Sequence, residues 1–158
     1  MTNAIPHGYH TVTPSLTFKD SQKAIDFYKK AFGARVLDVF PALSGRGIMH
    51  ATLAIGDSII MMGDEMPGGQ GCPSAESLGA SPMSLFIYVP DADVTFKTAV
   101  AAGAQEMMPV ADMFWGDRAG SLRDPFGYTW MVATHTRDMT KDQIRKEAEA
   151  FFAQMAKK

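Results

Sequence analysis

The chain has 158 residues, a length that corresponds to about one domain. Hydrophobic residues make up 46% and charged residues 20% of it, which excludes a disordered, collagen-like or coiled-coil chain. The net charge of −2 provides no basic field for a polyanion, so neither nucleic acid nor an anionic membrane surface is an expected partner. No apolar run approaches the roughly 20 residues that span a bilayer. A single cysteine, Cys72, and an N-terminus without signal-peptide regions favour the cytoplasm.

The first half of the chain has the pattern of a strand, a helix and three further strands. Apolar and polar residues alternate over residues 11–18, as in a half-buried strand. Apolar residues then recur at helical spacing up to Gly33, which predicts the end of a helix. Gly56-Asp57 is suited to a tight turn between the last two strands. The three strands are predicted at about 35–43, 48–55 and 58–63.

The second half repeats this order after a Gly- and Pro-rich linker at residues 65–83, which shows no periodicity. Ala31-Phe-Gly-Ala-Arg35 aligns with Ala101-Ala-Gly-Ala-Gln105, and Ile55-Gly-Asp-Ser-Ile-Ile-Met61 aligns with Phe126-Gly-Tyr-Thr-Trp-Met-Val132. Both matches have an offset of about 70 residues, which indicates a duplicated module. The second set of elements is predicted as a strand at 84–89, a helix at 92–102, and strands near 105–113, 120–123 and 129–134.

These patterns predict one domain, residues 1–158, of the α+β class. It contains two βαβββ modules, at residues 11–64 and 84–136. A C-terminal helix is predicted over 139–157, because the capping-box pattern Thr140-Lys-Asp-Gln143 precedes an apolar stripe.

Three segments resemble the vicinal oxygen chelate superfamily, which includes glyoxalase I, extradiol dioxygenases and bleomycin-resistance proteins. They are Ala24-Ile-Asp-Phe-Tyr-Lys-Lys-Ala-Phe-Gly-Ala34, His50-Ala-Thr-Leu-Ala-Ile-Gly-Asp-Ser58, and Trp115-Gly-Asp-Arg118 running into Asp124-Pro-Phe-Gly-Tyr-Thr-Trp130. Within the superfamily they are most similar to the PhnB-like branch, also labelled demethylubiquinone-methyltransferase-like. No glycine-rich loop after a parallel strand offers a site for adenosylmethionine, so methyl transfer is not expected.

The resemblance implies that each module curls its sheet into half of a cup that holds a ligand. In metal-dependent members His, Gln or Glu ligands lie on the first and last strand of each module, and these positions fall on Thr13, Ile60, Ser84 and Met131. Divalent metals need imidazole, thiolate or carboxylate ligands, so the usual metal site is not expected and no cofactor is predicted. An alternative is a relocated metal bound by His50, His135 and a carboxylate such as Glu65 or Asp64.

Two histidines are the candidate acid–base groups. By strand alternation His50 is predicted to point into the cup, and His135, which shares the parity of Met131, to lie near its rim. Either residue could instead be a hydrogen-bonded structural group. Because neutral imidazole both accepts and donates protons near pH 7, both remain catalytic candidates.

Further ligand-binding candidates are aromatic and basic. Phe86 and Tyr88 have the predicted cup-facing parity of Ser84, as Met62 has that of Ile60. Trp115-Gly-Asp-Arg118 is either a turn with a local ion pair, or an aromatic wall with a guanidinium that binds a carboxylate or phosphate. Arg123 is a second candidate anion anchor. The predicted ligand site comprises His50, Phe86, Tyr88, Trp115, Arg118 and Arg123, with His135 nearby.

The leading hypothesis is therefore a protein that binds a small organic ligand in the sheet cup without the usual divalent metal. The alternatives are a metal-dependent lyase, isomerase or dioxygenase with relocated ligands, and a protein that sequesters an antibiotic. A homodimer is predicted, because half-cups leave exposed strand edges that proteins normally cover or pair.

Overall fold

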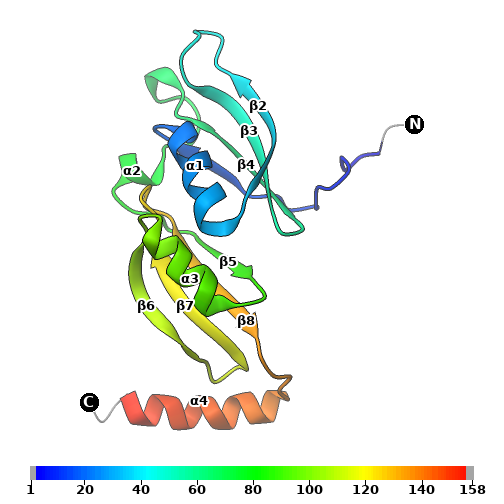
Figure 1. Cartoon of the computed structure of the whole chain (residues 1–158), viewed down its shortest axis with the longest axis vertical. Coiled ribbons are helices and arrows are strands. Elements are labelled where there is room, and N and C mark those ends of the chain that lie inside the picture. The colour runs from blue at the N-terminus through cyan, green and yellow to red at the C-terminus, as the bar shows by residue number, and fades with distance from the viewer. Residues whose placement is uncertain (1–2, 156–158) are drawn as a thin grey trace.

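Two four-stranded sheets, each with one long helix against one face, make up most of the chain in a computed structural model that describes residues 3–155 (Figure 1). The first module consists of β1 (Ser15–Phe18), α1 (Ser21–Phe32), β2 (Arg35–Pro41), β3 (Ile48–Ile55) and β4 (Ser58–Asp64). The second consists of β5 (Ser84–Tyr88), α3 (Ala92–Ala101), β6 (Gln105–Asp112), β7 (Asp117–Arg123) and β8 (Thr129–His135). The last element is α4 (Lys141–Met155).

The two sheets have the same topology. Their strand orders are β1-β4-β3-β2 and β5-β8-β7-β6. In each, the first strand pairs in parallel with the last, and the remaining pairs are antiparallel. The structure thus confirms the predicted α+β fold of two βαβββ modules followed by a C-terminal helix.

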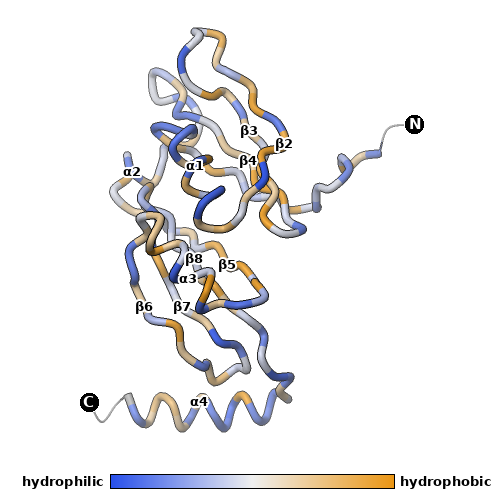
Figure 2. The backbone as a smooth tube through the Cα atoms, in the orientation of Figure 1, coloured by the Kyte–Doolittle hydropathy of each residue, from blue (hydrophilic) through white to orange (hydrophobic). Residues whose placement is uncertain are grey.

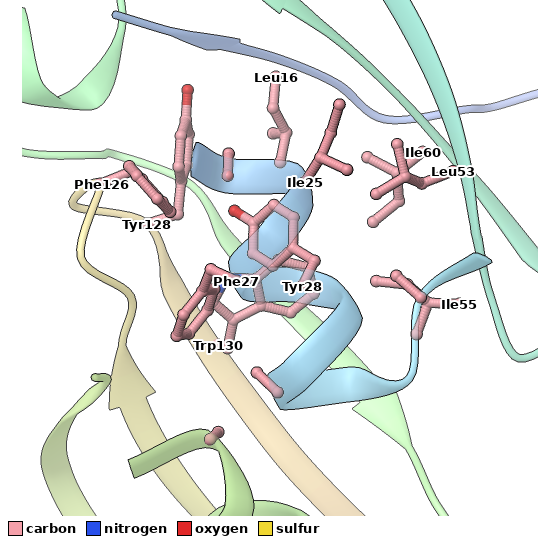
Figure 3. Packing of buried hydrophobic residues seen from close by; sticks show 14 of the residues in the cluster. Leu16, Ile25, Phe27, Tyr28, Leu53, Ile55, Ile60, Phe126, Tyr128 and Trp130 are labelled. Atoms are coloured by element: carbon pink, nitrogen blue, oxygen red, sulfur yellow. The ribbon is translucent and has the colours of Figure 1, made fainter. Parts of the chain in front are cut away.

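Helix α1 has end signals that the sequence supplies directly. The side chain of Asp20 caps its first turn by accepting a hydrogen bond from the Lys23 amide at 3.2 Å. Gly33 ends the helix in the left-handed conformation, with a φ of 65°. Between these ends the buried residues recur at helical spacing and face the first sheet, where they meet Leu16, Leu53 and Ile60 (Figure 3).

A single hydrophobic core joins the two modules on their helix sides. Helices α1 and α3 pack against each other. Tyr28 of the first module lies 5.3 Å from Trp130 of the second between ring centroids, and Figure 3 shows these rings side by side. Asp124 accepts hydrogen bonds from the Tyr28 hydroxyl at 2.7 Å and the Trp130 indole at 2.9 Å. The face of each sheet that points away from its helix is called here the open face.

Several elements differ from the predicted ones. Strand β1 begins at Ser15 instead of residue 11, and β7 begins at Asp117 instead of residue 120. The segment 65–83 is not structureless, because it contains the 3-10 turn η1 (Pro67–Gly69) and the short helix α2 (Ala75–Leu78). Ser74 caps α2 and donates its amide to the Glu65 carboxylate at 2.7 Å. Hydrogen bonds from the Ser77 side chain and from Ser74 lower the pKa of Glu65 to about 2.

Helix α4 begins two residues later than predicted, and residues 156–157 of the predicted helix lie outside the described part of the chain. Its capping box is present: the Thr140 hydroxyl accepts from the Gln143 amide at 3.3 Å, and the Gln143 side chain accepts from the Thr140 amide at 2.8 Å. Apolar and polar residues alternate along it (Figure 2). Among residues 3–155, no helix is long and apolar enough to cross a membrane.

Candidate functional site

Strand register determines which side chains occupy the open face of the second sheet. Leu122, Trp130 and Val132 are fully buried on the helix side. Residues paired across neighbouring strands share a face, so the alternate positions lie on the open face. The pairs Phe86↔Met131, Tyr88↔Ala133, Asp117↔His135, Ser121↔Met131 and Arg123↔Thr129 are therefore on this face.

Asp117 is the centre of a hydrogen-bond network at one end of this face. Its side chain is 3% exposed, and it accepts three hydrogen bonds from three different elements. Tyr88 of β5 donates its hydroxyl at 3.0 Å, and Trp115 of the β6–β7 turn donates its indole N–H at 2.8 Å. The Nδ1 atom of His135 at the end of β8 lies 2.7 Å from the carboxylate. This cluster of Tyr88, Trp115, Asp117 and His135 is called here the Asp117 network.

The network shifts the pKa values of its members. Burial acts to raise the pKa of Asp117, but the hydrogen bonds from His135, Tyr88 and Trp115 outweigh it and lower the pKa. The hydrogen bonds to Asp117 and to Asp138, whose carboxylate lies 3.1 Å from Nε2, raise the pKa of His135. The hydrogen bond to Asp117 also raises the pKa of Tyr88. The result is an exposed imidazole whose charged form is favoured by its hydrogen bond to a buried carboxylate.

Apolar side chains occupy the middle of the open face. Ala119 and Ala133 are fully buried, and Met113 is 8% exposed. Met108, Met131 and Trp115 pack around them. The two alanines are covered, so the partly buried side chains of Met108, Met131 and Trp115 form the accessible surface there. Flexible methionines adapt their shape to a bound molecule more readily than branched residues do.

Two aromatic residues and one arginine complete this face. The rings of Phe86 and Tyr88 are 5.0 Å apart, and these residues are 47% and 64% exposed. Both also line a groove of about 710 Å³ that runs between the modules, with walls from α1, α3 and the β3–β4 turn. Arg123 lies at the end of β7 opposite Asp117 and is exposed.

Arg118 does not lie with the other predicted residues. It pairs in register with Thr134, whose hydroxyl accepts from the Ala92 amide of α3 at 2.8 Å, so Arg118 faces the helix side. Its guanidinium binds Asp93 of α3 through two nitrogens and Asp112 through a third contact at 3.1 Å. Arg118 therefore forms neither the predicted ligand anchor nor a local pair with Asp117, and its ion pair with Asp93 instead joins α3 to the sheet.

His50 lies on the open face of the first sheet, and not in the Asp117 network. Its Nε2 atom is 3.1 Å from the Thr52 hydroxyl, which is 3.3 Å from the hydroxyl of Tyr9. The ring of Phe40 on the neighbouring strand is 6.2 Å from the imidazole. The structure thus brings together Phe86, Tyr88, Trp115 and His135, with Arg123 on the same face, and leaves His50 and Arg118 elsewhere.

Of the four positions that the resemblance suggested for metal ligands, two lie on an open face and two do not. Ser84 and Met131 are on the second open face, but Ile60 and Met62 pack in the core and not in the cup, because Thr52 pairs with Met61. Thr13 precedes β1 and donates its hydroxyl to the His10 carbonyl at 3.0 Å.

The carboxylates of the alternative metal site have structural partners. Asp64 accepts from the amides of Ser21 and Ile48, at 2.6 and 2.8 Å. Glu65 accepts from Ser74. No three His, Cys, Asp or Glu residues between positions 3 and 155 are placed together to hold a metal ion.

Sequence reasoning missed two features of the molecule. It treated Asp117 only as a turn residue in a possible ion pair with Arg118, and it gave Asp124 no role of its own. The hydrogen-bond partners of Asp117 are up to 29 residues away in the sequence, and those of Asp124 up to 96. No local sequence pattern therefore predicts that either carboxylate is the centre of a hydrogen-bond network. The usable signal was the pair of tryptophans, because a buried indole N–H normally finds an acceptor.

Known proteins with this architecture include several from bacteria. A relative from Mycobacterium bovis, described as an uncharacterised protein, is 36% identical over 137 residues, covering 85% of this chain and 89% of the relative. The crystal structure of TioX from Micromonospora sp. ML1 superposes with a TM-score of 0.64 at 30% identity, covering 80% of this chain and 98% of TioX. A PhnB protein from Bacillus cereus shares the fold, with a TM-score of 0.61 at 18% identity, covering 79% of this chain and 99% of that protein.

The sequence profile of one family matches nearly all of both modules, over residues 9–132. The match and the duplicated βαβββ topology agree. The chain belongs to the Glyoxalase/Bleomycin resistance protein/Dioxygenase superfamily.

Proposed function

We propose that this protein binds a small organic molecule on the open face of the second sheet. The Asp117 network is the observation that supports this proposal most strongly. A buried carboxylate with a lowered pKa, beside an exposed imidazole with a raised pKa, is typical of functional sites. The tyrosine hydroxyl and the imidazole supply polar groups at one end of a largely apolar surface.

The chemistry of the face indicates the ligand class. The methionine-rich centre suits a flat apolar body, and the exposed rings of Phe86 and Tyr88 offer surfaces for stacking. Arg123 at the opposite end provides a planar guanidinium for an anionic group. An aromatic molecule with one carboxylate or sulfonate fits this arrangement. Binding at this face needs no metal or cofactor.

The test uses anilinonaphthalene sulfonate, a fluorescent aromatic anion, as the probe. The proposal expects saturable binding to the wild-type protein. Phe86→Ala is expected to raise the Kd about fivefold and Arg123→Ala about threefold, which correspond to roughly 1 and roughly 0.7 kcal/mol of binding free energy. Both residues are exposed, so the melting temperature should stay close to that of the wild type.

Two control variants separate this face from other apolar surfaces. Leu43, in the first module, is 97% exposed, and Val94 of α3 is 60% exposed in the inter-module groove. Leu43→Ala and Val94→Ala should leave the Kd unchanged. Phe86 lines both the groove and the open face, whereas Arg123 lies only on the open face. If Val94→Ala weakens binding, or if Phe86→Ala weakens it and Arg123→Ala does not, the probe occupies the groove and the open-face proposal is wrong.

We further propose a cytoplasmic homodimer. Each sheet ends in edge strands, β1 and β2 in the first and β5 and β6 in the second, and association of two copies would cover such edges. Light scattering at micromolar concentration should give twice the 17.2 kDa mass of one chain. A mass of one chain would contradict the dimer.

A further inference from the structure

Helix α4 is attached to the turn that carries Trp115. The carbonyl of Gly116 in this turn accepts three hydrogen bonds from the segment after β8: the amides of Thr136 and Arg137, at 3.0 and 3.1 Å, and the Thr136 hydroxyl at 2.8 Å. Gly116 has a φ of 99°, and a Cβ there would collide with the Arg137 carbonyl. Only glycine allows this close approach of the two backbones.

The second half of α4 packs against the same turn through aromatic rings. Phe151 and Phe152 lie 5.6 and 5.9 Å from the ring of Phe114 between centroids. Phe114 in turn meets Trp115 edge to face at 4.9 Å. An Arg137–Glu147 pair, with nitrogen–oxygen distances of 3.2 and 2.6 Å, holds the middle of the helix. Figure 1 shows α4 lying across the end of the second sheet that is far from the first module.

These contacts form a continuous series from the helix to the Asp117 network. Phe151 and Phe152 restrain Phe114, Phe114 restrains Trp115, and the Trp115 indole donates to Asp117. The aromatic pair is nevertheless 42% and 59% exposed, so its burial contributes little to the core. Helix α4 also lies beyond residues 9–132, the part matched by the family profile.

We propose that α4 is a positioning element for the Asp117 network. By holding Phe114, Phe151 and Phe152 keep the Trp115 indole hydrogen-bonded to Asp117 and so preorganise the polar end of the open face. The role of the network in ligand binding rests on the proposed function, but the positioning can be measured without any ligand.

Trp115 provides the readout. The chain has two tryptophans, of which Trp115 shares the Asp117 carboxylate with His135, so an emission change that follows the titration of His135 is expected from Trp115. The charged and titratable groups around His135 are Asp117, Asp138 and, through Asp117, Tyr88. We expect the emission to change as the pH rises through the raised pKa of His135 and the imidazole loses its proton. Trp115→Phe should abolish that change and thereby assign it.

The test variant is the double substitution Phe151→Ala/Phe152→Ala in the full chain. It is expected to reduce the amplitude of the pH-dependent emission change at least about twofold and to increase quenching of Trp115 by acrylamide, with only a small shift in melting temperature. The matched control is Arg145→Ala/Glu149→Ala, two exposed positions on α4, which should change neither property.

A second set of variants tests the route through Phe114. Phe114→Ala should reproduce the double variant, and combining all three substitutions should add little, because residues in one contact series are not additive. Wild-type amplitude and quenching in the Phe151→Ala/Phe152→Ala protein would overturn the proposal. Failure of the probe to bind, with these emission changes intact, would instead contradict only the proposed function.

Discussion

Two buried aspartates at opposite ends of β7 accept hydrogen bonds from the same types of side chain in different surroundings. Asp117 is the first residue of the strand, and Asp124 follows its last residue. They are 2% and 3% exposed. Each accepts hydrogen bonds from one tyrosine hydroxyl and one tryptophan indole: Tyr88 and Trp115 for Asp117, and Tyr28 and Trp130 for Asp124.

The remaining donors make the difference. Asp124 also accepts from the amides of Phe126 and Tyr128, at 3.0 and 2.9 Å, inside the core shared by the modules, and burial raises its pKa. Asp117 accepts from the half-exposed imidazole of His135, and its pKa is lowered. A buried aspartate that binds one tyrosine and one tryptophan is therefore a structural junction when its other donors are backbone amides, as for Asp124. It is a titratable site when its other partner is an imidazole in contact with solvent, as for Asp117.

The largest effect in this comparison is expected for Asp124→Ala. It removes four hydrogen bonds and leaves the Tyr28 hydroxyl and Trp130 indole without an acceptor in the core, which should cost about 3 kcal/mol or more of unfolding free energy. Tyr28→Phe, which removes one bond, should cost about 1–2 kcal/mol. Urea denaturation measures both. Equal losses for the two variants would show that Asp124 is not the junction.

Asp117→Ala should destabilise the protein less, by about 1–2 kcal/mol, because solvent can replace the carboxylate as a partner for Tyr88 and His135. Tyr88 is 64% exposed, whereas Tyr28 is fully buried. The matched control is Thr52→Val on the open face of the first sheet, expected at about 1 kcal/mol or less. A loss for Asp117→Ala as large as that for Asp124→Ala would remove the distinction between junction and site.

Dependence on pH should distinguish the two aspartates further. The pKa of His135 is raised above its ordinary value of 6.5, so its contribution to stability is fully present below that pH. The contribution is lost as the pH rises through the folded-state pKa. The unfolding free energy is thus expected to fall as the pH rises above about 6.5 and through the raised folded-state pKa of His135. Asp117→Asn should flatten this part of the profile; the same slope in that variant would exclude the His135–Asp117 pair as its source.

The sequence was sufficient for the fold and for part of the site. Alternation in β5 and β8 placed Phe86, Tyr88, Met131 and His135 on one face, which is where the register has them. It failed in β4, because Ile59, Ile60, Met61 and Met62 are all apolar and show no period of two. The pairing with β3 settles the orientation there, and pairing is not visible in one strand.

Other differences have physical causes of the same kind. Strand β7 was expected to begin at Gly120, so strand alternation was not used to assign a face of the sheet to Asp117 or Arg118. These two residues are in fact the first two of the strand. His50 and His135 lie on the open faces of separate sheets, as their separate modules predict, but alternation within each strand could not reveal how the two faces are placed relative to each other. Long-range placement of this sort depends on tertiary packing and not on local sequence.

The smallest effect is expected at Arg118, the chain neighbour of Asp117 on the opposite face of β7. Its ion pair with Asp93 involves side chains that are 36% and 38% exposed, and such pairs contribute little because water screens them. Arg118→Ala should therefore destabilise the protein less than Asp117→Ala does, and by still less at high salt. It should leave the Kd for anilinonaphthalene sulfonate unchanged, whereas Arg123→Ala raises it. If Arg118→Ala raised the Kd as much as Arg123→Ala, the guanidinium would reach the open face, and the division of β7 into a helix side and a ligand side would be wrong.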